Sequence, residues 1–194
     1  MSNKSAIGMI EMNSIAKGYA VGDAMLKAAN VEIVFNRTIC PGKFMVMVAG
    51  DVAAVESAMS AGMELGSETI VDELVIPNVH PSVFSAISGT RVIEETAALG
   101  IIETFSVATI IQAADAAVKA ANVELIDIHL AMAIGGKGFL TLTGDVAAVT
   151  AAVEAGTDFI KSKGLLVDGD EYYTHSKTFN SRGGGAIEPQ IREQ

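Results

Sequence analysis

The stretch "GDVAAV" at residues 50–55 recurs without a change at residues 144–149. Working outward from it, "AIGMIEMNSIA" (6–16) matches "ALGIIETFSVA" (98–108), and "GDAMLKAANVEI" (22–33) matches "AADAAVKAANVEL" (113–125). The second copy gains two residues near 130–136. The sequence is therefore a tandem duplication, which favours two compact domains in a chain of 194 residues.

The order of hydrophobic patterns within one copy predicts its secondary structure. Strand patterns cover residues 6–11, 31–39, 43–50 and 69–77. Apolar residues at helical spacing follow Ser14 and Asp51, which are suitable N-cap residues, and residues 81–88 predict a short helix. The order βαββαβ is typical of a ferredoxin-like α+β unit with one antiparallel sheet and both main helices on one face. The other face of such a sheet then needs cover from a neighbour or from water.

We predict these domains at residues 5–88 and 98–180, with a linker at 89–97. The second copy diverges at its end, where Gly169 and the acids around it replace the apolar strand and no short helix is recognisable. Residues 181–194 contain Gly, Pro and charge without periodicity, which predicts a disordered tail.

Composition excludes several classes of function. A formal net charge of −10 without a cluster of Lys and Arg argues against nucleic acid as a partner. Charged residues interrupt every long apolar stretch, and the N-terminus lacks the pattern of a signal peptide, so we expect a cytoplasmic protein that does not enter a membrane. The apolar mass comes from Ala, Val, Ile and Met, which favours burial against other chains.

The single cysteine, Cys40, lies in "RTICPGKF" (37–44), where Pro41 and Gly42 predict a tight turn. One cysteine excludes an internal disulfide and fits a reducing compartment. The residues alone leave three possibilities open for Cys40, namely an unused thiol, a disulfide between two chains, and a metal ligand.

The corresponding turn of the second copy, "MAIGGKG" (132–138), has no cysteine. Gly135 and Gly136 suit a close approach of backbones, but the spacing of a phosphate-binding loop is absent, which excludes an NTPase. Lys43 and Lys137 lie at equivalent positions of the two turns, where they either form a cationic rim or extend into solvent.

The remaining polar residues predict no catalytic site. Glu11 and Glu103 end equivalent strands, and neither has an obvious acidic partner for acid–base catalysis. The spacing of the three histidines resembles no metal site, so we expect structural or solvent roles for His80, His129 and His175. We therefore predict that the protein is not an enzyme.

Several segments together resemble the shell-protein domain of bacterial microcompartments, the BMC domain. They are "AIGMIE", "DAMLKAANVE", "PGKF", "GDVAAV" and "VIPNVHPSV". The duplication resembles the tandem-domain class. "TICPGKF", "HPSVFSAISG" and "IGGKGF" are similar to the iron–sulfur members of that class found in propanediol-utilisation microcompartments.

This resemblance implies a homotrimer that forms a flat pseudo-hexameric tile and assembles with other shell proteins. The turns at Pro41, Gly42 and Lys43 and at Gly135, Gly136 and Lys137 would line a central pore. One Cys40 from each subunit would bind a single [4Fe-4S] cluster there for electron transfer across the shell, with lumenal redox enzymes as further partners. The implied location is the microcompartment shell in the cytoplasm.

The resemblance also implies contacts at the edge of the tile. Lys27 and Lys119 match family lysines at that edge, and Asn30 and Asn122 lie close to them. Asp23 and Asp115, four residues before the lysines, offer helix-surface pairing as the other explanation. The asparagines equally suit the C-terminal ends of helices.

Two other functions compete with the iron–sulfur shell protein. A trimeric pore or small-molecule sensor without metal would use the same fold, and so would an enzyme, which the lack of a catalytic constellation disfavours.

Overall fold

The computed structural model describes residues 5–89, 97–132, 134–161 and 166–173. The elements of the first copy are β1 (Ala6–Met12), α1 (Ile15–Ala28), β2 (Glu32–Ile39), β3 (Lys43–Gly50), α2 (Val52–Gly66), a 3₁₀ turn (Ser67–Thr69), β4 (Ile70–Pro77) and α3 (Pro81–Ile87). The elements of the second copy are β5 (Ala98–Thr104), α4 (Val107–Ala120), β6 (Glu124–Leu130), β7 (Gly138–Gly144), α5 (Val146–Lys161) and β8 (Leu166–Tyr173).

Each copy forms its own antiparallel sheet, in the order β2-β3-β1-β4 and β6-β7-β5-β8. The two orders are identical once the copies are aligned, and they confirm the ferredoxin-like prediction. The predicted caps also form, because the Ser14 hydroxyl accepts a hydrogen bond from the Lys17 amide at 3.3 Å and the Asp51 carboxylate accepts one from Ala54 at 2.9 Å. Residues 90–96 of the predicted linker and the predicted tail lie outside the described residues.

The end of the second copy differs from the prediction. The segment around Gly169 does form a strand, β8, which pairs antiparallel with β5 from Ala98↔Tyr173 to Thr104↔Leu166. Strand pairing uses backbone groups that every residue except proline offers, so the acidic composition did not prevent it. Gly169 suits this strand because a Cβ there would lie 2.5 Å from Cγ2 of Thr157 on α5.

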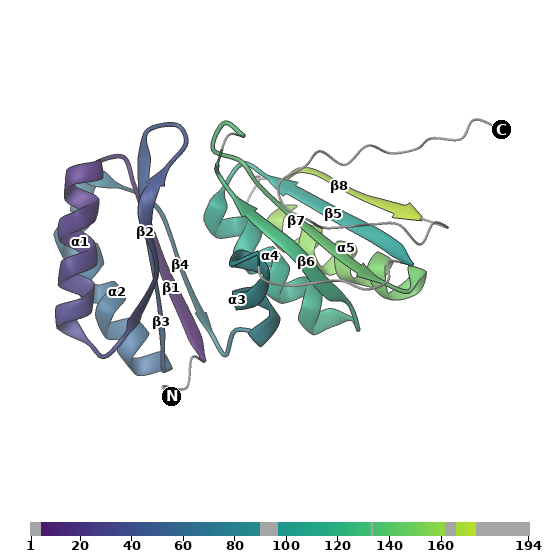
Figure 1. Ribbon diagram of the computed structural model, residues 1–194, viewed down its shortest axis with the longest axis horizontal. Coiled ribbons are helices and arrows are strands. Elements are labelled where there is room, and N and C mark those ends of the chain that lie inside the picture. The colour runs from purple at the N-terminus through teal and green to yellow at the C-terminus, as the bar shows by residue number, and fades with distance from the viewer. Residues whose placement is uncertain (1–4, 90–96, 133, 162–165, 174–194) are drawn as a thin grey trace.

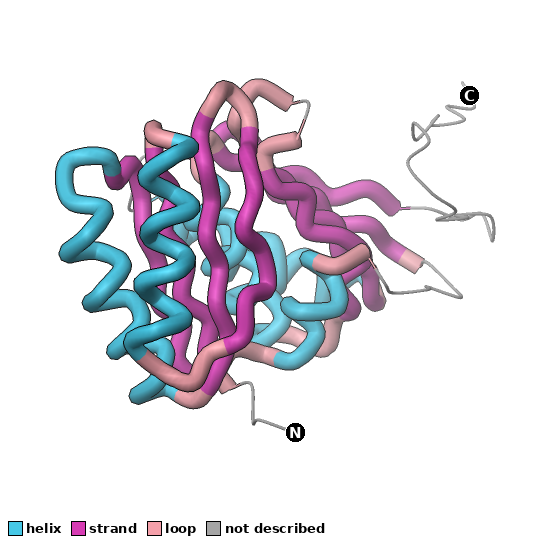
Figure 2. Tube along the Cα trace, turned by 60° about the vertical axis from the view of Figure 1, so that its left-hand side comes forward, coloured by secondary structure: helices cyan, strands magenta, loops and turns pink. Residues whose placement is uncertain are grey.

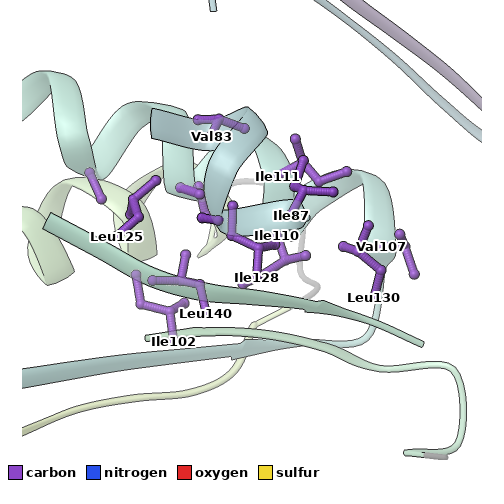
Figure 3. Close-up of a cluster of buried hydrophobic side chains, with 14 of the residues drawn as sticks. Val83, Ile87, Ile102, Val107, Ile110, Ile111, Leu125, Ile128, Leu130 and Leu140 are labelled. Carbon is purple, nitrogen blue, oxygen red and sulfur yellow. The ribbon is translucent and has the colours of Figure 1, made fainter. Parts of the chain in front are cut away.

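The two copies pack against each other through the first sheet. Helices α1 and α2 cover one face of this sheet, and α3 and α4 lie on its other side, between the two sheets (Figure 1). The face that the sequence left uncovered is thus covered by the chain itself: Met9, Met45 and Leu74 belong to one buried cluster with residues of α3 and α4. Part of this cluster is drawn in Figure 3, which labels Val83 and Ile87 of α3 together with Ile110 and Ile111 of α4.

Candidate functional site at the cysteine turn

The turn that carries Cys40 joins β2 to β3 and lies at one end of the first sheet (Figure 1). Cys40 is half-buried and its thiol is free. Gly42 adopts φ +74° with open space around it, a conformation that favours glycine and explains the Pro-Gly sequence. The turn therefore presents a single thiol at the surface of the fold.

The structure brings the second turn next to the first. The Cys40 amide donates a hydrogen bond to the carbonyl oxygen of Ala131 at 3.2 Å, and the Ala131 amide donates one to the Lys137 carbonyl at 3.0 Å. A Cβ on Gly136 would lie 3.0 Å from the Cys40 carbonyl oxygen. The turn at the end of β2 and the turn before β7 lie side by side at one end of the molecule in both views (Figures 1 and 2). The predicted pore residues therefore form one surface.

Each of the two lysines of these turns forms an ion pair with a glutamate. Lys43 forms an ion pair with Glu11 at 2.5 Å, and Glu11 is only 3% exposed. Lys137 pairs with Glu103 in the equivalent arrangement. A carboxylate at the end of each central strand thus neutralises the lysine of the adjacent turn. The sequence predicts no acidic partner for these glutamates. The signal for their lysine partners was the repeat, because each copy has a glutamate at the end of its first strand and a lysine in its turn.

The predicted tile-edge residues lie away from this surface. Strand β2 runs from the end of α1 to the cysteine turn, so Lys27 and Asn30 lie at the opposite end of the first sheet. Both lysines do pair with the aspartate four residues earlier, Lys27 with Asp23 at 2.5 Å and Lys119 with Asp115 at 2.6 Å. Asn30 and Asn122 follow α1 and α4 by two residues, as expected for residues near helix C-termini.

The histidines have structural partners. His80 precedes α3, where its Nδ1 accepts a hydrogen bond from the Ser82 amide at 3.3 Å, and its own amide donates to Asp115 at 2.8 Å. His129 stacks on Phe139 and lies 2.8 Å from the Met132 carbonyl oxygen through Nε2. His175 lies outside the described residues. Burial raises the pKa of nearby Asp127, and His129 partly offsets this shift through its charge.

Two features near the cysteine turn were missed from the sequence. Arg37 places its guanidinium 4.3 Å from the centre of the Phe35 ring, and its buried Nε has no hydrogen-bond partner within the described part of the chain. A pocket of about 320 Å³ lies beside the Glu11–Lys43 pair at the junction of the copies. It is lined by Glu11, Lys43, Val71, Asp72, Phe105 and Ser106. The sequence gave no signal for either feature, because both depend on which side chains the fold brings together.

A metal site built by one chain is not present in the described ranges, because no three His, Cys, Asp or Glu side chains come together there. The donor set offered to an iron–sulfur cluster is one free thiol on a surface turn. Iron–sulfur clusters are held by several thiolates, so this donor set fits a cluster only if several chains contribute.

A search of protein-family models matches the BMC domain twice, at residues 6–79 and 98–171. The chain belongs to the BMC-domain family. The resemblance found in the sequence is confirmed, and the two matched ranges each contain one four-stranded sheet.

Individual relatives agree with this membership. This chain is 51% identical over 162 residues to the bacterial microcompartment shell protein PduT of Citrobacter freundii. The matched region covers 84% of this chain and 88% of the relative. The chain is 29% identical over 168 residues to the carboxysome assembly protein CcmO of Synechococcus elongatus, over 79% of this chain and 59% of that relative.

Solved structures show the same fold. A microcompartment protein from Desulfitobacterium hafniense superimposes with a TM-score of 0.83 and 47% identity, over 88% of this chain and 95% of the other. A fused permuted hexameric shell protein of the RMM microcompartment gives a TM-score of 0.60 at 23% identity, over 80% and 81% of the two chains, and supports the fold alone.

The chain is therefore a structural shell protein of a bacterial microcompartment, with two BMC domains in tandem. Its named relatives are shell and assembly proteins rather than enzymes. Among the described residues, no helix combines the length and the apolar composition that crossing a membrane requires.

Proposed function

We propose that the shell protein is a homotrimeric tile that binds one [4Fe-4S] cluster through three Cys40 thiolates and carries electrons across the shell. The observation that carries this proposal is the unequal burial of the same helix face in the two copies. That face is covered on α4 and uncovered on α1, which supports a second chain as its cover.

Helices α1 and α4 occupy the same place in the repeat. Val107 and Ile111 of α4 are fully buried, because the first sheet and α3 pack on that side. Their counterparts on α1, Ile15 and Tyr19, are 42% and 59% exposed. Exposed apolar residues aligned along one helix face favour burial against a partner.

The second sheet offers the complementary surface. Its outer face carries a separate small apolar cluster formed by Leu99, Ile126 and Ile101. In the first sheet the equivalent positions Ile7 and Met9 contact the covering layer of the second copy. If each second sheet packs on the α1 side of the next chain, every junction in the ring repeats the junction inside the chain.

A ring built in this way closes with three chains when six similar domains surround one axis. A specific pair of residues makes the equivalence concrete. The Ser106 hydroxyl, which also caps α4, donates a hydrogen bond to Asp72 of β4 at 2.6 Å. The counterpart of Ser106 is Ser14, which caps α1. The counterpart of Asp72 is position 168 of β8, because in the strand register it lies opposite Glu103 as Asp72 lies opposite Glu11. They belong to different chains at the proposed junction.

The proposed axis turns one thiol per chain into three equivalent thiols. The cysteine turn and the second turn share one end of the molecule, as a pore surface requires. A [4Fe-4S] cluster bound there would supply one-electron transfer, with one iron not held by cysteine. The residues of this chain hold the thiol, and the pairs Lys43–Glu11 and Lys137–Glu103 keep the nearest lysine charges neutralised. Other shell proteins at the tile edge and redox enzymes of the lumen are the proposed partners.

Anaerobic purification of the intact protein tests both parts of the proposal. We expect a brown trimer with about four irons per three chains and an EPR signal after reduction. The Cys40→Ser variant should remain a trimer and lose the iron and the signal. A colourless wild-type trimer after iron and sulfide reconstitution would contradict the cluster, and a monomer at micromolar concentration would contradict the ring.

The pocket beside Glu11 and Lys43 favours a second candidate, a metal-free trimeric pore or small-molecule sensor. Its lining combines both charge signs with the Ser106 hydroxyl and the Phe105 ring, which suits a small polar molecule. A colourless trimer that binds such a molecule, and loses it when Asp72 is changed to Asn, would favour this candidate over the cluster.

A further inference from the structure

The turn of the second copy contacts the cysteine turn through two consecutive backbone hydrogen bonds. The Lys137 carbonyl accepts from the Ala131 amide at 3.0 Å, and the Ala131 carbonyl accepts from the Cys40 amide at 3.2 Å. Ala131 is fully buried and adopts φ +54°, a conformation that an alanine adopts only when its surroundings hold it. The position of Cys40 is thereby tied to the backbone of the other domain.

Gly136 adds a contact that depends on the absence of a side chain. A Cβ built there would lie 3.0 Å from both the Cys40 carbonyl oxygen and Cδ of Pro41. The neighbouring Gly135 also has a positive φ, +68° against +87°, yet a Cβ there would meet nothing within 4 Å. The two glycines thus share a backbone requirement and differ in their contact with the cysteine turn.

The cysteine turn is held on its other side by its own domain. Lys43, three residues after Cys40, is fixed to the buried Glu11 by the ion pair. Gly42 between them has no heavy atom within 4 Å of a built Cβ. The turn is therefore anchored at its two ends, one end by the second copy and one by β1, while the space around Gly42 is open.

We propose that Ala131 and Gly136 are positioning residues, which set where the Cys40 thiol points. This gives a role to the two residues that the second copy gains here relative to the first, because the longer second turn contacts the cysteine turn. The consequence of this inference for the cluster rests on the proposed function. Its consequence for the direction of the Cys40 thiol holds for the protein without iron.

The matched variants Gly136→Ala and Gly135→Ala test the inference. Both impose the same kind of backbone strain, but only Gly136→Ala pushes on the cysteine turn. In iron-free protein, we expect iodoacetamide to alkylate Cys40 several-fold faster in Gly136→Ala than in the wild type. The added methyl group pushes the cysteine turn away from the second turn, which exposes the half-buried thiol. Gly135→Ala should react at the wild-type rate, and intact-mass spectrometry follows both reactions.

Equal rates in the two variants, whether changed or unchanged, would overturn the proposal. Hydrogen exchange of the wild-type protein provides a test that needs no variant. The Cys40 amide should be protected, because it donates to Ala131, and exchange at the rate of an unstructured peptide would also overturn the proposal.

Iron loading separates this inference from the proposed function. If the wild type takes up a cluster, Gly136→Ala should bind several-fold less iron under limiting iron and sulfide than Gly135→Ala, and equal uptake would count against positioning. If the wild type takes up no iron, the cluster proposal fails, and the alkylation and exchange results alone decide whether the second turn positions the thiol.

Discussion

The pairs Asp23–Lys27 and Asp115–Lys119 have the same residues at the same spacing in the two copies, yet they lie in different surroundings. In the first pair the side chains are 73% exposed for Lys27 and 62% for Asp23. In the second pair they are 43% exposed for Lys119 and 10% for Asp115. The difference arises because α3 of the first copy packs beside α4, and the His80 amide donates to Asp115.

A duplicated sequence thus does not give two equivalent surfaces. One copy of each interface is closed within the chain, and its counterpart is uncovered in the single chain, where we propose that another chain packs. The closed interface therefore serves as a template for the open one, and variants at matched positions can test how far the likeness extends.

The largest expected effect on stability concerns the first residue of α4, whose counterpart is the first residue of α1. Val107→Asp places a carboxylate at a fully buried position, and an unpaired buried charge of this kind costs about 3–5 kcal/mol of folding free energy. We expect the second domain to unfold in urea at a much lower concentration. Retention of the wild-type urea midpoint would contradict the description of this interface.

Its matched control is Ile15→Asp at the equivalent, exposed position. An acidic residue in the first turn of a helix is favourable, so the chain should keep its far-ultraviolet circular dichroism. The same carboxylate would lie in the proposed junction between chains, and we expect the trimer to dissociate to monomers in analytical ultracentrifugation. A persistent trimer would show that α1 does not form the junction.

The next effect concerns the aspartates of the two ion pairs. Asp115→Ala leaves the His80 amide without its acceptor, which costs about 1–3 kcal/mol of the unfolding free energy. Asp23→Ala removes only an exposed pair, worth about 0.3–0.5 kcal/mol. Both changes are best measured by urea denaturation in the Ile15→Asp background, which removes the coupling between unfolding and trimer dissociation. Equal costs would contradict the asymmetry.

Prediction from the sequence succeeded where the two copies repeat a local pattern. Ser14 and Asp51 cap helices as expected, and the strand order is that of the ferredoxin-like unit predicted from the element order βαββαβ. It failed for β8, because backbone pairing with β5 outweighs an acidic composition. Whether the domain boundaries of 5–88 and 98–180 hold in solution stays a prediction.

At the candidate site, the sequence identified the turns but not their contacts. Glu11 and Lys43 are 32 residues apart, and Ala131 and Cys40 are joined across two domains. Such contacts depend on tertiary packing, for which a single sequence gives no local signal. The sequence left a cationic rim and solvated lysines as alternatives and indicated neither ion pair, since the acidic partners lie at the ends of the adjacent strands.

The smallest expected effect concerns Asp127, whose counterpart in the first copy is Phe35. Burial raises the pKa of Asp127, so its neutral form is favoured in the folded state, and the stability it provides is lost as the pH rises through this raised pKa. Asp127→Asn should therefore raise the melting temperature at pH 7. The gain should vanish near pH 3, below the ordinary value of 3.8, where the wild-type carboxyl is neutral in both states. Differential scanning fluorimetry at the two pH values measures the effect. An equal gain in melting temperature at both pH values would assign the gain to packing or hydrogen bonding. It would also show that the folded second copy tolerates the ionised Asp127 carboxylate, although the equivalent position of the first copy holds the apolar ring of Phe35.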